Sequence, residues 1–228
     1  MRLDRFLSNA HAGTRSQVKK LVKDGRVKVN GITAQTSSMQ INENTYSVTL
    51  DDEPVVFARY CYYMLNKPAG YISATEGNVP LVTDLIHEND SGMFPCGRLD
   101  KDTEGLLLIT NDGPLAHKLL SPKHHVEKEY FVELAIPVSD DDINRISQGI
   151  TYDGETYQPA VFKPRTEYSG TIILKEGKYH EIKEIFKSLG NHVTYLKRIR
   201  MKNLVLDTSL KPGEYRPLTE EEINDLKA

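Results

Sequence analysis

Residues 97–113 of the chain read GRLDKDTEGLLLITNDG, a polar loop that runs directly into an apolar stretch. Residues 106–109 are continuously apolar and end at an Asn-Asp-Gly turn signal, so they predict a short buried strand. The loop therefore enters the core at a fixed point, and functional side chains are best held by such rigid elements. Gly97 and Gly105 flank the loop and allow backbone angles or close approaches that other residues resist.

Two aspartates lie in this loop, Asp100 and Asp102. If Leu99 and Asp100 are extended, one side chain faces the core and the other a cleft. Polar loop residues most often serve turns and helix caps, and the spacing by itself favours that interpretation. A D-x-D spacing also suggests a metal site or a glycosidase pair, but the side chains of an extended chain diverge and no third ligand lies nearby.

The order of the residues carries more information than their spacing. Gly97-Arg98-Leu99-Asp100, with Thr103 and residues 105–107, closely resembles the catalytic motif of the RsuA branch of pseudouridine synthases. The resemblance covers nearly the whole chain and implies that Asp100 is the nucleophile. Because Arg98 lies next to this residue, we expect it to help hold the displaced RNA strand.

The resemblance implies an α+β fold with two domains. Residues 60–228 would form the catalytic domain around the mixed, largely antiparallel sheet of the pseudouridine synthase fold. Residues 1–59 would form a small S4 (α-L) RNA-binding domain with a linker, and we place the boundary near Arg59.

The bulk composition is that of a soluble globular chain. The 228 residues are 39% hydrophobic and 27% charged, and no apolar run approaches the roughly 20 residues that span a bilayer. The beginning of the sequence has no apolar segment typical of a secretion signal. Cys61 and Cys96 are not in a C-x-x-C pair, so they favour free thiols in a reducing compartment over a disulfide or zinc site. We expect a cytoplasmic protein that does not contact membranes.

Positive charge is concentrated at the beginning of the chain. Residues 1–30 hold eight Lys or Arg against two Asp, so this segment carries +6 while the whole chain carries −3. Such asymmetry points to a localised anionic partner. The basic segment could instead be a solvated helix face, but its clustering favours phosphate contacts.

The same segment has the pattern of a small RNA-binding module. Apolar residues at helical spacing predict one helix before the break at 13–16, where Thr14 or Ser16 can cap a second helix that stops at Asp24-Gly25. Residues 27–34 predict a hairpin that turns at Asn30-Gly31. This order resembles the S4 module, whose helices would dock on phosphates with little reading of bases. The residues that we assign to this contact are Arg5, Arg15, Lys19, Lys23 and Arg26. Residues 40–59 suit turns and a linker.

Three further stretches carry the resemblance into the rest of the chain. Lys67-Pro68 resembles the first motif of the family, and we interpret Lys67 as framework. Residues 128–130, K-E-Y, resemble the second motif, whose tyrosine stacks on the target base; alternation alone would equally allow Tyr130 to be a core residue. Residues 176–183, EGKYHEIK, resemble the third motif and give Lys183 the position of the basic partner of the nucleophile.

The third motif begins a predicted helix and contains one departure. Apolar residues at 182, 185, 186 and 189 have the spacing of one buried helix face. Glu181 occupies a position where the family usually has glutamine. An extra carboxylate there would repel Asp100 or compete for Lys183 unless it faced outward.

A second basic stretch follows at 193–202, where the alternation predicts a strand that lines an RNA groove with Lys197, Arg198 and Arg200. The adjacent histidines at 124 and 125 point apart and lack a third ligand, so we expect no metal site. Formation of pseudouridine transfers no external atom or electron, and we expect no cofactor.

The prediction is an enzyme that isomerises one uridine of 16S, small-subunit ribosomal RNA in the bacterial cytoplasm. It would act as a monomer on ribosomal RNA or on a small-subunit assembly intermediate. Within the same class, the alternative is a synthase acting on 23S ribosomal RNA, against which the short C-terminal segment argues mildly. From another class, the alternative is a non-catalytic S4-type RNA-binding or ribosome-assembly factor, with Glu181 as a sign of lost activity.

Overall fold

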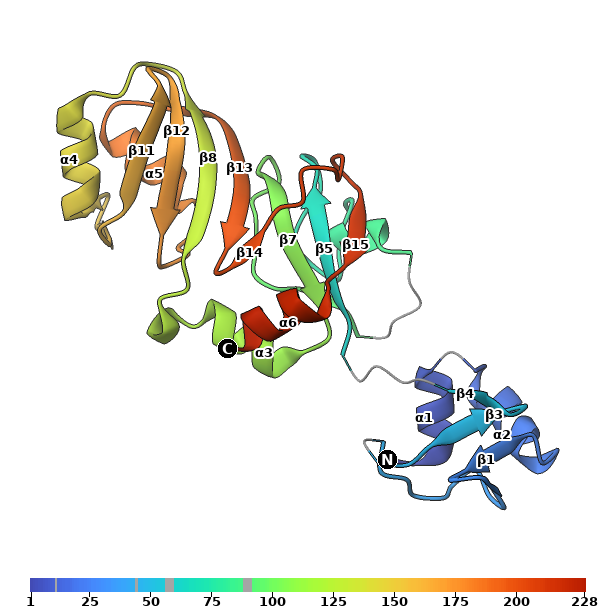
Figure 1. The fold of residues 1–228 in the computed structure, drawn as a ribbon. Helices are drawn as coiled ribbons and strands as arrows, with labels where there is room; N and C mark the ends of the chain where they lie inside the picture. Colours follow the sequence, from blue (N-terminus) through green and yellow to red (C-terminus); the bar gives the residue numbers. More distant parts are fainter. Residues whose placement is uncertain (11, 44, 56–59, 88–91) are drawn as a thin grey trace. The chain divides into compact units, whose positions relative to one another are not determined.

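The structure, a computed structural model, describes residues 1–10, 12–43, 45–55, 60–87 and 92–228. These form two compact units, and the chain passes from the first to the second between Tyr60 and Cys61. Arg59, near which the sequence analysis puts the boundary, lies outside the described residues. Figure 1 shows each unit with its own sheet and helices.

The first unit packs two helices on a four-stranded sheet of order β2-β1-β3-β4. Its elements are α1 (Leu3–Asn9), α2 (Arg15–Lys23), β1 (Val27–Val29), β2 (Ile32–Thr33), β3 (Val48–Leu50) and β4 (Glu53–Pro54). The predicted cap is confirmed, because Thr14 accepts from the backbone N–H of Gln17 in a reciprocal capping box. The predicted hairpin is also confirmed: Asn30 and Gly31 have φ of 51° and 78°, the positive angles of a type I′ turn.

The interpretation of residues 40–59 as turns and linker is wrong for the segment that forms β3 and β4. β3 pairs antiparallel with β1 and places Val48 in the core of this unit, at 3% exposure. Three residues between polar neighbours are too short for a clear alternation, and the pairing with β1 supplies what the local pattern lacks.

The second unit is built on one nine-stranded sheet whose main path is β11-β12-β8-β13-β7-β5-β15. β14 pairs with β13, and β6 pairs with β7. β13 and β7 run parallel, whereas the other neighbours are antiparallel, so the predicted mixed, largely antiparallel sheet is confirmed. The strands are β5 (Tyr62–Lys67), β6 (Phe94–Pro95), β7 (Glu104–Thr110), β8 (Lys128–Leu134), β11 (Val161–Thr166), β12 (Ser169–Leu174), β13 (Val193–Met201), β14 (Leu204–Val205) and β15 (Tyr215–Pro217).

Short helices and a small two-stranded sheet surround this large sheet. They are the 3₁₀ turns η1 (Val82–Leu85) and η2 (Pro122–His124), the helices α3 (Gly113–Leu120), α4 (Asp140–Gln148), α5 (Glu181–Ser188) and α6 (Glu220–Lys227), and the strands β9 (Ile150–Tyr152) and β10 (Glu155–Tyr157). Ser139 and Thr219 begin α4 and α6 with reciprocal capping boxes. None of the helices in the described ranges is long and apolar enough to cross a membrane.

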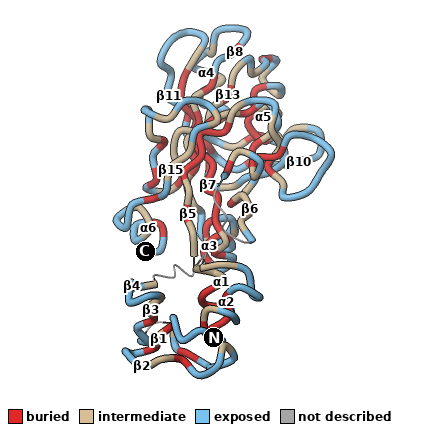
Figure 2. Tube along the Cα trace, turned by 90° about the vertical axis from the view of Figure 1, so that its right-hand side faces the viewer, coloured by how far each residue is buried: buried red, intermediate tan, exposed pale blue. Residues whose placement is uncertain are grey.

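The core lies between the sheet and α5. The apolar run 106–109 is fully buried in β7, as predicted, and Figure 2 shows this part of the chain among the buried segments of the unit. Ile182, Ile185 and Phe186 of α5 are each at most 4% exposed, and the Phe186 ring packs edge-on against Phe162. The predicted buried face of this helix is therefore confirmed.

The parallel pairing of β7 with β13 depends on a glycine. Gly105 has φ of 97°, and a Cβ atom there would lie 2.2 Å from the carbonyl oxygen of Arg198. Only a residue without a side chain allows the two backbones to approach this closely. The polar loop that precedes β7 is thus held tightly against β13.

Candidate active site

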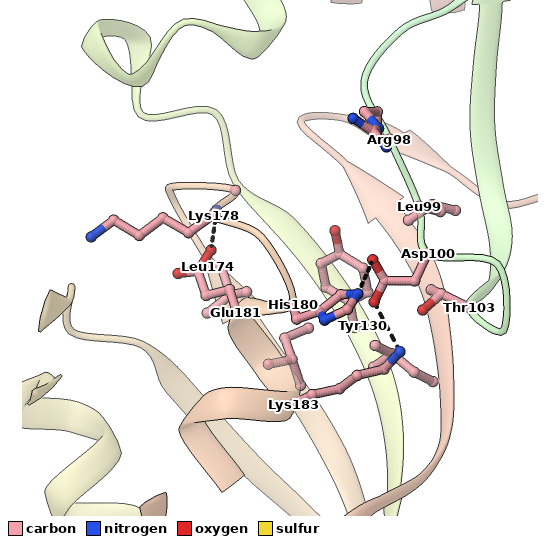
Figure 3. A pocket seen from close by; sticks show the side chains of 13 residues that line it. Arg98, Leu99, Asp100, Thr103, Tyr130, Leu174, Lys178, His180, Glu181 and Lys183 are labelled. Atoms are coloured by element: carbon pink, nitrogen blue, oxygen red, sulfur yellow. Dashed lines mark hydrogen bonds and ion pairs between the residues drawn. The ribbon is translucent and has the colours of Figure 1, made fainter. Parts of the chain in front are cut away.

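One pocket brings together the residues of the three motifs. It has a volume of about 70 Å³ and receives Asp100 from the loop before β7, Tyr130 from β8, and His180 and Lys183 from the start of α5. Figure 3 shows these side chains pointing toward one another. The remaining lining residues are Arg98, Leu99, Thr103, Leu174, Gly177, Lys178, Glu181, Ile182 and Leu196.

Asp100 forms an ion pair with Lys183. The Nζ of Lys183 lies 2.9 Å from Oδ2 of Asp100, and each side chain is 25% exposed. Leu99 is 6% exposed and belongs to the apolar core, but it lines the pocket together with Asp100, so the predicted division of this dipeptide between core and cleft holds only in part. Burial lowers the pKa of Lys183, but hydrogen bonds to Asp102 and Asp100 more than offset it and leave the pKa raised. The pair therefore holds a charged ammonium beside the carboxylate.

Asp102 joins the same ammonium, which the sequence analysis missed. Its Oδ1 lies 2.6 Å from Nζ of Lys183, so the expectation that Asp100 and Asp102 diverge is wrong. The loop is not extended there: residues 101–102 form a turn, and the N–H of Thr103 donates to the carbonyl of Asp100. The turn swings both carboxylates toward α5.

His180 also contacts Asp100 and was not singled out from the sequence. Its Nε2 lies 3.5 Å from Oδ1 of Asp100. The residue adopts a left-handed backbone conformation, with φ of 53°, directly before α5. Such a conformation is uncommon for a residue with a side chain, and here it lies beside the acid of the pocket.

Tyr130 is both a core residue and a wall of the pocket. It is 9% exposed and belongs to the apolar cluster that includes Ile172 and Leu196. Alternation on β8 allowed Tyr130 to be either a core residue or a pocket residue. In the structure the same ring packs in the core and lines the pocket. A ring fixed in this way is suited to contact a planar ligand.

Lys67 supports the loop from within the protein. The residue is fully buried, and its Nζ donates to the carbonyl oxygens of Thr103 at 2.7 Å, Asp100 at 3.0 Å and Lys101 at 3.3 Å, besides its neighbour Pro68 at 3.1 Å. Burial lowers its pKa to about 8. These contacts match the interpretation of Lys67 as framework.

Glu181 neither faces outward nor pairs with Lys183. It is 4% exposed, and its Oε2 accepts from the N–H of Lys178 over 2.9 Å, while Oε1 is buried without a partner among the described residues. Figure 3 shows its side chain directed toward Lys178. Burial raises its pKa to about 8, and the nearby carboxylate of Glu176 adds to this effect. Burial therefore favours the neutral form of Glu181, which is similar in shape to glutamine.

The three basic residues of β13 that were predicted to line an RNA groove, Lys197, Arg198 and Arg200, do not share one surface. Lys197 lines a second cavity, of about 470 Å³, with Phe131 and Arg165, and not the pocket of Asp100. Arg198 is 2% exposed and its Nε donates to the carbonyl of Leu106, so the prediction that it contacts RNA is wrong for this structure. Successive residues of a strand point to opposite faces, which separates these two cations.

Two other predicted basic residues are engaged in ion pairs. Arg200 contacts Glu129 at 2.8 Å and Glu127 at 3.1 Å. Arg26 pairs with Asp51. The remaining candidates are exposed: Arg98 beside the pocket, and Arg5, Arg15, Lys19 and Lys23 on the first unit. In the parts of the chain that the structure describes, no group of three His, Cys, Asp or Glu side chains could hold a metal ion.

Comparisons with known proteins identify the family of the chain. A model of the RNA pseudouridylate synthase family matches residues 61–188, and a model of the S4 domain matches residues 1–45. An uncharacterized RNA pseudouridine synthase of Bacillus subtilis is 45% identical, over 98% of this chain and 97% of the relative. Ribosomal small subunit pseudouridine synthase A of Haemophilus influenzae is 39% identical, over 99% of each chain.

A solved structure shows the same architecture. The crystal structure of a pseudouridylate synthase superposes with a TM-score of 0.71, at 37% sequence identity and with 99% of each chain covered. The chain therefore belongs to the RNA pseudouridylate synthase family, in the RsuA branch that its sequence motifs resemble.

Proposed function

We propose that this chain isomerises one uridine of small-subunit (16S) ribosomal RNA to pseudouridine, with Asp100 as the reacting carboxylate. The observation that carries the proposal is the ion pair of Asp100 with Lys183 in a pocket walled by the Tyr130 ring. The choice of RNA rests on full-length relatives named ribosomal small subunit pseudouridine synthase A.

The reaction breaks the bond from ribose C1′ to N1 of uracil and forms a bond from C1′ to C5. N1 gains a proton, and C5 loses one to solvent, so atoms and electrons balance without a co-reactant. Asp100 would begin the sequence, by attack at the sugar or by removal of its 2′ proton. Lys183 places a positive charge 2.9 Å from this carboxylate, and the attraction between the two charges holds the acid in position.

The free uracil must turn over without leaving the pocket. We assign this restraint to Tyr130, because stacking between a base and an aromatic ring contributes roughly 1–3 kcal/mol. The target uridine must first leave its own stack, which costs a few kcal/mol. Arg98 would hold the displaced strand, and the exposed cations of the first unit, Arg5, Arg15, Lys19 and Lys23, would bind phosphates. The expected partner is ribosomal RNA or a small-subunit assembly intermediate, bound by a monomer in the cytoplasm.

Release of tritium from 5-labelled uridine in ribosomal RNA tests the proposal. The wild type should release tritium, Asp100→Asn should fall to background, and Asp102→Asn should remain active as the matched control. Background release from wild type and Asp100→Asn alike would favour a non-catalytic RNA-binding factor. Mapping pseudouridine in a strain without the gene tests the choice of RNA: loss at a 23S site would replace the small subunit by the large one.

A further inference from the structure

Tyr179 is an aromatic side chain that the pocket does not use. It is 77% exposed, although it lies one residue before His180, whose side chain lines the pocket. A single exposed aromatic residue is common on protein surfaces and needs no special explanation. Tyr168, 49% exposed next to β12, is of this ordinary kind. What distinguishes Tyr179 is the group on which its ring lies.

The phenol ring of Tyr179 is stacked on the imidazole of His180. The ring centroids are 3.7 Å apart and the planes differ by 25°. The imidazole therefore covers one face of the phenol ring, and the high exposure of Tyr179 leaves the opposite face open to solvent.

This stack is connected to the reacting carboxylate. The same imidazole places its Nε2 3.5 Å from Oδ1 of Asp100. Figure 3 marks this contact with a dashed line. Side chains of adjacent residues usually diverge, and here the left-handed backbone of His180, with φ of 53°, accompanies their stacking. Asp100, His180 and Tyr179 thus form a continuous series that leads from the pocket to an exposed ring next to one of its lining residues.

The pocket is too small to hold more than the reacting part of an RNA strand. Its volume is about 70 Å³, so the nucleotides on both sides of a target uridine must lie outside it. RNA-modifying proteins meet such unstacked bases with exposed aromatic rings, whose flat faces accept any base. The open face of Tyr179 offers this surface next to His180, which lines the pocket.

We propose that Tyr179, supported by His180, is a stacking platform for the unpaired nucleobase adjacent to the target uridine. The inference rests on the proposed function, because it assigns a contact to the RNA strand that enters the same pocket. Stacking on the outer face of Tyr179 replaces the base stacking that the neighbour loses when the target leaves the helix. Because a π face is common to all bases, the platform gives affinity and direction to the strand with little preference for sequence.

The experiment measures binding of the single-stranded heptamer AAAUAAA and of two derivatives. In these derivatives the adenosine on the 5′ or the 3′ side of the uridine is replaced by an abasic residue. The proteins are the wild type, Tyr179→Ala, Tyr179→Trp and the control Tyr168→Ala. For the intact RNA, Tyr179→Ala should raise Kd by about 5- to 100-fold, while Tyr179→Trp and Tyr168→Ala should stay near the wild-type value.

The abasic RNAs separate stacking from a structural effect. With one of the two abasic RNAs, the Kd of the wild type should rise by the same factor, about 5- to 100-fold. The Kd of Tyr179→Ala should not rise further. A 2-aminopurine at that position should be quenched by the wild type and not by Tyr179→Ala. Equal binding of intact RNA by wild type and Tyr179→Ala would overturn the proposal. The proposal would also be overturned if both abasic changes raised the Kd of Tyr179→Ala as much as that of the wild type. The same holds if the wild type bound intact and abasic RNA with equal Kd. Loss of tritium release in Asp100→Asn is scored separately, so a failed platform and a failed enzyme give different results.

Discussion

The buried ammonium group of Lys67 donates a hydrogen bond of 3.0 Å to the backbone carbonyl of Asp100. A lysine of β5 thereby holds the loop that carries the reacting acid, and it reaches Thr103 in the same way at 2.7 Å. The position of the carboxylate thus depends on a residue that does not face the substrate.

Replacement of Lys67 by Met should loosen this loop. The buried carbonyl group of Thr103 and three partly buried carbonyl groups would lose their donor. A buried group left unpaired costs about 1–3 kcal/mol, so the free energy of unfolding should fall by about 3 kcal/mol. Turnover should fall as well, because Asp100 is no longer fixed. Urea unfolding and tritium release measure the two effects. Lys101→Met, an exposed residue of the same loop, is the control. If both variants behave alike, the buried hydrogen bonds do not position the acid.

Replacement of Lys183 by Met should act on turnover more than on RNA binding. It removes the ammonium 2.9 Å from Asp100, and removal of one such electrostatic contact typically costs about 10²–10³ in kcat. Asp102→Asn should stay within about fivefold of the wild type, because the side chain of Asp102 is 73% exposed and water screens its contact with Lys183. Single-turnover tritium release together with the Kd for RNA separates the effects. An unchanged kcat in Lys183→Met would remove the role of the ion pair.

Replacement of Glu181 by Gln should change how stability depends on pH. The pKa of Glu181 is raised from 4.5 to about 8 in the folded chain, mainly by burial. Between these values the folded state keeps a proton that the unfolded state has released, so stability falls as pH rises, by up to about 1.4 kcal/mol per unit. In Glu181→Gln the stability should no longer fall as pH rises, whereas in Glu184→Gln it should fall as in the wild type. Urea unfolding at pH 5.5, 6.5 and 7.5 measures the free energy of unfolding of each protein. An equal dependence on pH in the wild type and Glu181→Gln would contradict the effect of burial on this carboxyl.

Replacement of Gly105 by Ala should disrupt the β7–β13 pairing. The new methyl group would lie 2.2 Å from the carbonyl oxygen of Arg198, at a φ of 97° that side chains rarely adopt. We expect a loss of about 3 kcal/mol or more in the free energy of unfolding. Gly113→Ala is the matched control, because nothing lies within 4 Å of its added Cβ. Thermal unfolding of the two variants should differ clearly, and similar melting temperatures would show that the strands can separate without loss.

Reversal of Lys19 and Lys23 to Glu should weaken RNA binding and reduce its dependence on salt. Both residues are exposed on α2, and loss of two phosphate contacts should lower the slope of log K against log salt by about two. Lys163→Glu, an exposed change on β11, is the control. Filter binding at several salt concentrations measures the slope. A slope equal to that of the wild type would place the phosphate contacts elsewhere.

Local patterns predicted the elements whose cause is local. The continuous apolar run in β7, the helical spacing in α5 and the cap at Thr14 each follow from a few neighbouring residues, and the structure contains all three. β3 was not predicted, because its three residues form a strand only through their pairing with β1.

In the candidate site, too, sequence motifs identified some residues and missed those placed there by distant contacts. The motifs indicated Asp100, Tyr130 and Lys183, which the structure places in one pocket. Asp102 and His180 contact members of this group across about 80 residues of sequence, a relation that no local period encodes. Arg198 was misjudged because alternation distinguishes two faces of a strand without saying which one is covered.

The place of β15 at the edge of the large sheet has a consequence for synthesis of the protein. Residues Tyr215–Pro217 pair with Tyr63–Leu65 of β5, the strand next to β7. Before residues 215–217 are synthesised, this edge of β5 has no strand beside it among the described residues. Because Tyr130 and Lys183 precede β15 in the sequence, both are made before this edge can be paired.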